Sequence, residues 1–192
     1  MMAPVLKAGR GLELRPLNLR DARALFALVE TNRDRLRRWL PWPDANRSLL
    51  DSRAYVLRVR AQARLGVARS FGLWSADRLV GVAGFVWIDP VNRSAAIGYW
   101  LAHEAEGQGL MTRAVTALLR HGFRDLYLNR IEIRAGIRNR RSRAIPERLG
   151  FRHEGTLRQA ERLAERYVDH AIYSLLVEEW RAAGRRPSGP SL

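Results

Sequence analysis

A short glycine turn between an apolar run and an amphipathic stretch constrains this chain more than any other feature. The run Ile97–Leu101 has the composition of a buried strand, and Gly107-Gln108-Gly109 follows it after a polar segment. Beyond the turn, apolar residues recur with helical period, at Met111, Ala114, Val115, Leu118, Leu119 and Leu126. Because the first N–H groups of a helix have no partner within it, a strand, turn and helix can together hold phosphates. We therefore expect a phosphate-bearing cofactor.

Three kinds of phosphate site share this arrangement. A P-loop has a lysine and a serine or threonine directly after its last glycine, where this chain has Leu110 and Met111. A dinucleotide-binding fingerprint has a third glycine, where this chain has Thr112. Both matches fail, which leaves a cradle for the pyrophosphate of coenzyme A.

The residues around the turn carry a family resemblance. Glu106-Gly107-Gln108-Gly109-Leu110-Met111-Thr112 resembles the Q/R-x-x-G-x-G/A signature of the GNAT acyltransferase superfamily. With the further stretches IGYWL, NRIEIR, SRAIPERLGF and EGTLRQAE, the chain is similar to the ribosomal-protein serine and alanine N-terminal acetyltransferases of that superfamily, from about Leu12 to Trp180. Two signature positions depart, since Glu106 replaces Gln or Arg and Met111 replaces Gly or Ala. Glu106 adds a negative charge near a pyrophosphate.

The resemblance implies acetyl-CoA as the cofactor and two central strands that splay apart, one ending at Leu101 and the other Ile131–Ile137. Pantetheine would lie in the gap, because splayed strands leave unpaired backbone groups that the amides of a ligand can satisfy. The residues expected to bind the cofactor are Trp100, Leu101, Gly107, Gln108, Gly109, Leu110, Met111, Thr112, Asn139 and Ser142.

Catalysis is expected to rest on Ser142 and Glu161. Many members of the superfamily place a tyrosine acid four residues after the Ser142 position, where this chain has Pro146. The resemblance therefore assigns the proton donor to Ser142 and the general base to Glu161. Glu154 is the second candidate base and Asp169-His170 the third, although His170 in an alternating strand also fits a structural, hydrogen-bonded histidine. Two alternatives stay open: Asn139 or Ser142 caps a short helix, and Glu161 is a loop acid paired with a neighbouring arginine.

The acceptor site is expected to be walled by Trp39, Trp42, Tyr99 and Glu161, although the Trp39–Pro43 corner could equally be a hydrophobic plug. The chemistry favours an N-terminal amine over a lysine side chain. Their reference pKa values are about 8 and about 10.4, so deprotonation at pH 7 costs about 1.4 against about 4.6 kcal/mol. A single carboxylate base suits the easier task.

Composition excludes several other classes. The chain has no cysteine, which excludes disulfides, thiol intermediates and cysteine-ligated metals, and no histidine pair is spaced for a metal. The formal net charge of +15 favours acidic partners, but the arginines are spread among acids rather than held in one block. Without a long apolar run or a signal-peptide pattern, a soluble, cytoplasmic protein is expected.

The elements predict a single α/β domain. We expect a GNAT-like fold with a mixed, mostly antiparallel sheet of about seven strands, splayed at the centre and flanked by about four helices. Residues 1–11 are expected to be a loose terminus, residues 12–182 the acetyltransferase domain, and residues 183–192 a disordered tail. Two late strands, Phe151–Leu157 and Tyr167–Val177, are expected to be joined by a charged loop.

The expected function is acetyl-CoA-dependent transfer to the N-terminal α-amine of a protein, ribosomal proteins included, by direct attack in a ternary complex. Rival functions are acetylation of a small amine, such as an aminoglycoside or polyamine, and a non-catalytic module that binds acyl-CoA or RNA. The expected partners are a protein N-terminus, the ribosome or its RNA through the basic surface, and a second copy in a homodimer, with no membrane.

Overall fold

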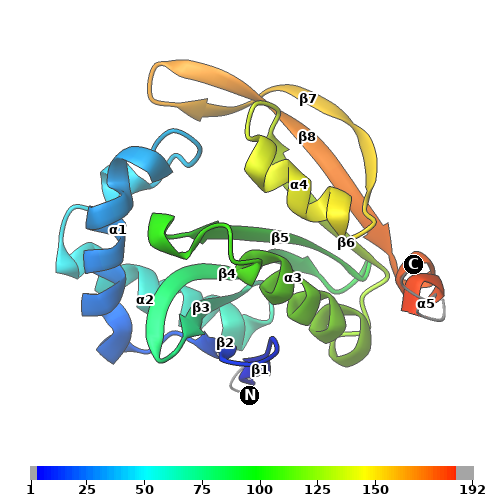
Figure 1. Cartoon of the computed structure of the whole chain (residues 1–192), viewed down its shortest axis with the longest axis horizontal. Helices are drawn as coiled ribbons and strands as arrows, with labels where there is room; N and C mark the ends of the chain where they lie inside the picture. The colour runs from blue at the N-terminus through cyan, green and yellow to red at the C-terminus, as the bar shows by residue number, and fades with distance from the viewer. Residues whose placement is uncertain (1–3, 185–192) are drawn as a thin grey trace.

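A computed structural model describes residues 4–184 of the chain. Within that range it has one eight-stranded sheet in the order β1-β2-β3-β4-β5-β6-β8-β7 (Figure 1). All neighbouring strands are antiparallel except β5 and β6, which run parallel. The mixed, mostly antiparallel sheet is therefore confirmed, with eight strands where about seven were expected.

The strands are β1 (Leu6–Lys7), β2 (Leu12–Pro16), β3 (Arg69–Ser75), β4 (Arg78–Asp89), β5 (Ser94–Leu101), β6 (Arg130–Gly136), β7 (Arg152–Leu163) and β8 (Arg166–Leu176). The described residues form five α-helices where about four were expected: α1 (Ala22–Leu36), α2 (Leu49–Leu65), α3 (Leu110–Arg120), α4 (Arg140–Arg148) and α5 (Val177–Gly184). The shorter helical turns are η1 (Leu19–Asp21), η2 (Pro43–Ala45), η3 (His103–Ala105) and the π-helical η4 (His121–Asp125).

The two ends of the domain differ from the expectation. Residues 6–7 form β1 and pair with β2, so the loose terminus expected over residues 1–11 is wrong for this part. The Arg113 side chain also holds the segment, because it donates to the carbonyl oxygens of Ala8 and Arg10 at 2.9 and 2.7 Å. At the other end, residues 183–184 complete α5, and the rest of the expected disordered tail lies outside the described residues.

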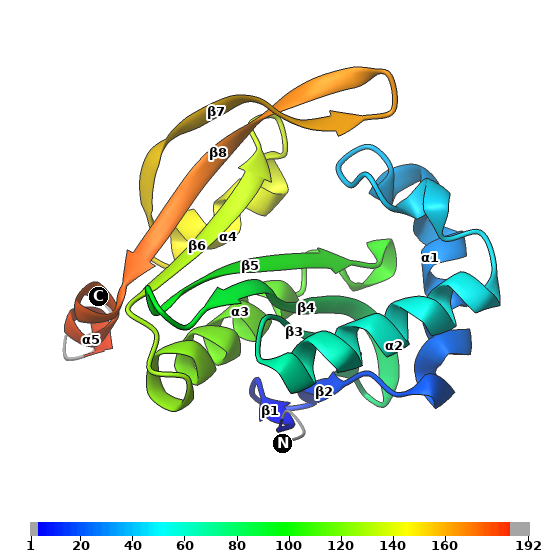
Figure 2. The same ribbon diagram turned by 180° about the vertical axis from the view of Figure 1, so that it is seen from behind.

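The helices cover both faces of the sheet, as Figures 1 and 2 show from opposite sides. Adjacent residues of β4 point to opposite faces, so Val82 packs with α1 and α2 while Ala83 packs with α3. The side with α1 and α2 buries Leu17, Leu25, Val29, Val56 and Leu79. The side with α3 buries Phe71, Phe85, Val115, Leu118, Ile131 and Ile133. Two cores on one sheet fix α1 and α3 on opposite sides of β5.

The centre of the sheet splits where β5 meets β6. The two strands pair only over Ser94–Ile97 and Arg130–Ile133, and the rest of each strand diverges. Beyond this point β6 continues with β8, and β5 continues with β4. The predicted splay is confirmed. No helix in the described part of the chain has the length and apolar content needed to cross a membrane.

Candidate active site

The glycine turn opens onto space at the start of α3. Gly107 and Gly109 have φ values of 76° and 69°, a left-handed conformation that favours glycine. A Cβ added at either position would meet nothing within 4 Å. Gly109 is the N-cap residue of α3, and no side chain caps the helix there. The first N–H groups of α3 therefore remain available to a phosphate, and the residues present fit the pyrophosphate of coenzyme A.

The residues after the turn contribute differently. The side chains of Leu110 and Met111 are buried in the core against the sheet, so only their backbone faces the turn. This explains why Met111 is compatible with a signature position that usually holds Gly or Ala. The hydroxyl of Thr112 accepts a hydrogen bond of 3.0 Å from Arg148 Nη1, which ties the end of α4 to the start of α3.

Across the split, Tyr99 on β5 is hydrogen-bonded to Ser142 on α4. The Tyr99 hydroxyl donates to the Ser142 carbonyl oxygen at 2.9 Å, and Ser142 Oγ donates to the Tyr99 oxygen at 3.3 Å. That carbonyl is free because Pro146, one helical turn later, has no N–H to donate. Burial raises the pKa of the Tyr99 hydroxyl, so the hydroxyl keeps its proton at neutral pH. The residue predicted to line the acceptor site thus bridges the two halves of the sheet.

Asn139 caps α4. Its side-chain oxygen accepts a hydrogen bond of 3.1 Å from the Ser142 N–H, which is the capping alternative left open by the sequence. The Ser142 hydroxyl takes no part in the cap and stays with Tyr99. Capping therefore accounts for Asn139 but not for Ser142.

Glu161 lies within β7 rather than in a charged loop, which corrects the expectation for this segment. Its partner is a histidine rather than an arginine, because Glu161 Oε2 lies 3.4 Å from His170 Nε2 on β8. The hairpin continues past both residues, as Glu161 pairs with Val168 in the ladder. Nearly all of β7 is exposed on both faces, so its sequence has no apolar alternation from which a strand could be predicted.

Glu154, the second candidate base, is hydrogen-bonded to Arg130 and Ser174. Arg130 donates to both of its oxygens at 2.6 and 2.8 Å, and the Ser174 hydroxyl donates to one of them at 2.7 Å. The hydrogen bonds from Arg130 and Ser174 lower the pKa of Glu154 to about 2. A carboxylate with so low a pKa is a weak base, which leaves Glu161 as the better candidate.

The aromatic corner after α1 contacts both sides of the split. The rings of Trp42 and Trp100 pack with centroids 5.8 Å apart, so Trp42 covers the open end of β5. A Cβ added at Gly136, the last residue of β6, would lie 3.6 Å from the Trp39 ring. From above, the β7–β8 hairpin reaches toward the end of α1 (Figure 1), where Arg166 Nη2 donates to the Arg38 carbonyl at 3.0 Å.

Comparison with known proteins agrees with this geometry. The model of the acetyltransferase (GNAT) domain family matches residues 11–152. The chain belongs to the GNAT acetyltransferase family. The ribosomal-protein-serine acetyltransferase of Escherichia coli (strain K12) is 33% identical over 177 residues, which cover 92% of this chain and 99% of the relative.

Solved structures extend the likeness of this GNAT acetyltransferase to the whole fold. The RimL alpha-N-protein acetyltransferase in complex with coenzyme A has a TM-score of 0.89 and 31% identity, covering 92% of this chain and 99% of that one. The microcin self-immunity acetyltransferase MccE, in complex with acetyl-CoA and AMP, has a TM-score of 0.85 and 28% identity, covering 88% and 94%. The expected GNAT fold and acetyltransferase class are confirmed.

Glu106 departs from the family signature, and two arginines neutralise its charge. Arg35 on α1 and Arg141 on α4 each donate to one of its carboxylate oxygens, while His103 Nδ1 lies 3.8 Å away. The acid thus joins both walls of the split at the edge of the glycine turn. The sequence predicted the added charge but not its partners, because Arg35 and Arg141 lie far from Glu106 along the chain.

Proposed function

We propose that this acetyltransferase transfers the acetyl group of acetyl-CoA to the N-terminal α-amine of a protein in the cytoplasm, with ribosomal proteins as the acceptor class. The observation that carries the proposal is the Glu161–His170 pair, a partly buried carboxylate next to an imidazole. The reference pKa of an α-amine is about 8, so a single carboxylate is a sufficient base for its deprotonation. The name of the 33% identical relative, a ribosomal-protein-serine acetyltransferase, supports the same acceptor.

The residues have separate parts in the proposed reaction. Glu161 takes the proton of the attacking amine, and His170 keeps the carboxylate oriented. The amine nitrogen forms a bond to the acetyl carbonyl carbon as the bond from that carbon to sulfur breaks. Tyr99 accepts the hydrogen bond of Ser142 before the reaction and so positions its hydroxyl. The Ser142 hydroxyl then turns its proton toward the departing sulfur, gives the proton to it, and takes a proton from solvent after the thiol has left. The chain has no cysteine, so no acetyl-cysteine intermediate can form on it.

Binding of the cofactor in this proposal uses backbone rather than side chains. The free N–H groups at the start of α3 receive the pyrophosphate, and the unpaired edge of β5 at Trp100 and Leu101 receives the pantetheine amides. Gly107, Gln108 and Gly109 keep the turn open for this purpose. Trp39 and Trp42 wall the acceptor at the opposite end of the split.

The test is an acceptor panel offered to the pure protein with acetyl-CoA. The panel holds peptides that begin with Ser, Ala or Met, the same peptides with a blocked N-terminus and one internal lysine, spermidine and an aminoglycoside. Thiol release gives the rate, and mass spectrometry of fragments locates the acetyl group. We expect acetylation of free N-terminal amines only. Acetylation confined to lysine side chains or small amines, or cofactor binding without any thiol release, would contradict the proposal.

A further inference from the structure

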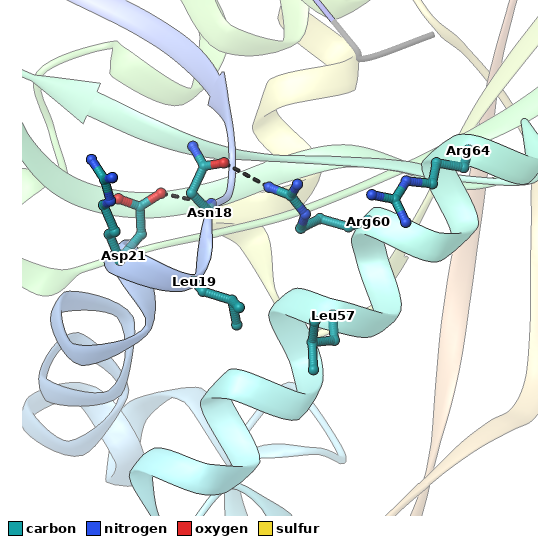
Figure 3. Close-up of a pocket in the computed structure, with 7 residues that line it drawn as sticks. Asn18, Leu19, Asp21, Leu57, Arg60 and Arg64 are labelled. Atoms are coloured by element: carbon teal, nitrogen blue, oxygen red, sulfur yellow. Dashed lines mark hydrogen bonds between the residues drawn. The ribbon is translucent and has the colours of Figure 1, made fainter.

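A groove lies between η1 and α2, at the opposite end of α1 from the aromatic corner (Figure 3). Its volume is about 560 Å³, and it is lined by Asn18, Leu19, Arg20, Asp21, Leu57, Arg60 and Arg64. None of these residues belongs to the active site described above. We refer to these seven residues as the α2 groove.

The α2 groove carries an excess of positive charge. Three of its residues are arginines and one is an acid. Asp21 accepts a hydrogen bond of 2.8 Å from the Asn18 N–H, and Arg60 donates to the Asn18 side chain at 2.6 Å (Figure 3). Among the described residues, Arg20 and Arg64 have no salt-bridge partner. Two guanidinium groups therefore remain available for carboxylates, which they can bind in bidentate geometry.

The floor of the groove is apolar and open to solvent. Leu19 and Leu57 are 48% and 54% exposed, and Leu50, which lies on α2 outside the groove, is 71% exposed. Leu50 and Leu57 are seven residues apart on α2, so they lie on one face of the helix. Single exposed leucines are common, but leucines aligned on one face beside unpaired arginines form a surface with both apolar and basic character.

We propose that the α2 groove docks an acidic, leucine-bearing helical segment of the acceptor protein, outside the reaction site. The carboxylates of such a segment match Arg20, Arg60 and Arg64, and its leucines match Leu19 and Leu57. Single-stranded RNA fits less well, because none of the seven lining residues is aromatic and RNA sites stack bases on aromatic rings. That the docked protein is the acceptor rests on the proposed function; that the groove binds the segment does not.

The position of the groove sets a length for the acceptor. The groove lies at the start of α1, and Trp39 follows the end of that helix, which has 15 residues. A helix of this length spans about 22 Å. An extended chain covers at most about 3.3–3.6 Å per residue, so about seven residues or more must separate the docked segment from the amine that reacts.

Binding to the groove is tested first, without turnover. The probe is a fluorescein-labelled, 20-residue peptide whose Glu and Leu residues repeat with helical period, and the control probe has Lys in place of Glu. The charge-reversal variant Arg60→Glu/Arg64→Glu should weaken binding of the acidic peptide about tenfold or more, and Leu57→Ser should weaken it by a smaller factor. Arg120→Glu is the control for charge reversal, because Arg120 is exposed like Arg64 but lies on α3, on the other face of the sheet.

Three results of the binding experiment would overturn the docking proposal. The first is that Arg120→Glu weakens binding of the acidic peptide as much as Arg60→Glu/Arg64→Glu does. The second is that the Lys probe binds as tightly as the acidic probe. The third is that the groove substitutions change the affinity of neither probe. A 20-nucleotide oligouridylate is run alongside. If it binds with an affinity that depends on Arg60 and Arg64 while the acidic peptide does not bind, the groove takes nucleic acid and the proposal is wrong.

Turnover then tests whether the docked protein is the acceptor. A short Ser-initiated peptide is joined to the acidic segment through spacers of two, four, eight and twelve residues. The KM should fall about tenfold once the spacer reaches about eight residues, with kcat unchanged, and Arg60→Glu/Arg64→Glu should abolish that gain. If no peptide is acetylated while the acidic peptide still binds, the proposed function fails and the docking site stands. If all peptides are acetylated with the same KM, the docking site is not an acceptor site.

Discussion

The two ends of the split in the sheet differ in whether backbone or side-chain groups form them. At the proposed cofactor end, one stretch from the end of β5 to the start of α3 contributes mainly backbone: two left-handed glycines, an uncapped helix and an unpaired strand edge. At the proposed acceptor end, side chains come from four distant segments: the corner after α1, the end of β5, and strands β7 and β8.

This difference explains how each end tolerates substitution. Backbone groups persist whatever the side chain is, so Glu106 and Met111 can depart from the signature without closing the turn. The proposed acceptor site depends on side chains instead. Replacing one tryptophan or glutamate is therefore expected to change which acceptors it binds. We therefore expect cofactor affinity and acceptor turnover to respond to different residues.

The largest separation is expected from Glu161→Gln. Loss of the base should lower kcat on N-terminal peptides by about 10²–10⁴-fold, while the Kd for coenzyme A stays within about twofold. Thiol-release assays measure kcat, and isothermal titration calorimetry measures the Kd for coenzyme A. Glu165→Gln is the control, since Glu165 lies in the same hairpin but is paired with Arg162 rather than His170. Unchanged turnover in Glu161→Gln would remove this residue from the mechanism.

Gly109→Val should have the opposite effect, with a large change in the Kd for coenzyme A and a small change in the choice of acceptor. A branched residue at a φ of 69° is strained by roughly 1–2 kcal/mol, and its methyl groups would occupy the space that the turn leaves open. Coenzyme A should bind about tenfold more weakly or worse, with much of the acceptor discrimination retained. Gly66→Val carries the same type of strain at a φ of 75° at the end of α2. If both variants lose affinity equally, general destabilisation rather than the turn is responsible.

Tyr99→Phe affects the link between the two halves. Without the Tyr99 hydroxyl, the Ser142 carbonyl loses its donor, which Pro146 cannot replace because it has no N–H. The Ser142 hydroxyl loses its acceptor as well. The free energy of unfolding should fall by about 1–3 kcal/mol, and kcat should fall about fivefold with the Kd for coenzyme A unchanged. Chemical denaturation and steady-state kinetics measure these effects. Tyr167→Phe, at an exposed position, should change neither; a similar loss there would contradict a specific role for Tyr99.

The smallest effect is expected from Glu106→Gln, which restores a residue of the family signature. Releasing Arg35 and Arg141 from the carboxylate makes them available to the pyrophosphate, so coenzyme A should bind about two- to fivefold more tightly at low salt. The gain should vanish at about 1 M salt, where charges are screened. Glu104→Gln, an exposed acid of the same segment, is the control. Weaker binding would mean that Glu106 positions the arginines rather than competing for them.

Prediction from sequence succeeded where the signal was local. The strand, turn and helix around Gly107–Gly109 lie within one short stretch, and their periodicity gave the element types and the cofactor class. The substitution of Pro146 for the usual tyrosine could be read directly, but the compensating bond from Tyr99 to the Ser142 carbonyl could not. That contact joins residues 43 positions apart.

Prediction failed where structure depends on tertiary pairing. β1 is two residues long and has no periodicity of its own; it exists because β2 offers an edge and Arg113 holds the adjoining carbonyls. β7 is charged and exposed on both faces, so it resembles a loop in sequence and becomes a strand by pairing with β8. The same pairing brings His170 to Glu161, a partner that the loop interpretation replaced with an arginine.

The most direct test is the double variant Gly109→Val/Glu161→Gln, measured by kcat/KM on one Ser-initiated peptide. If the cofactor end and the acceptor end act independently, the losses of the two single variants should add on a logarithmic scale to within about 0.3–0.5 kcal/mol. A double variant no worse than Glu161→Gln alone would contradict the account, because it would mean that both ends act as one unit.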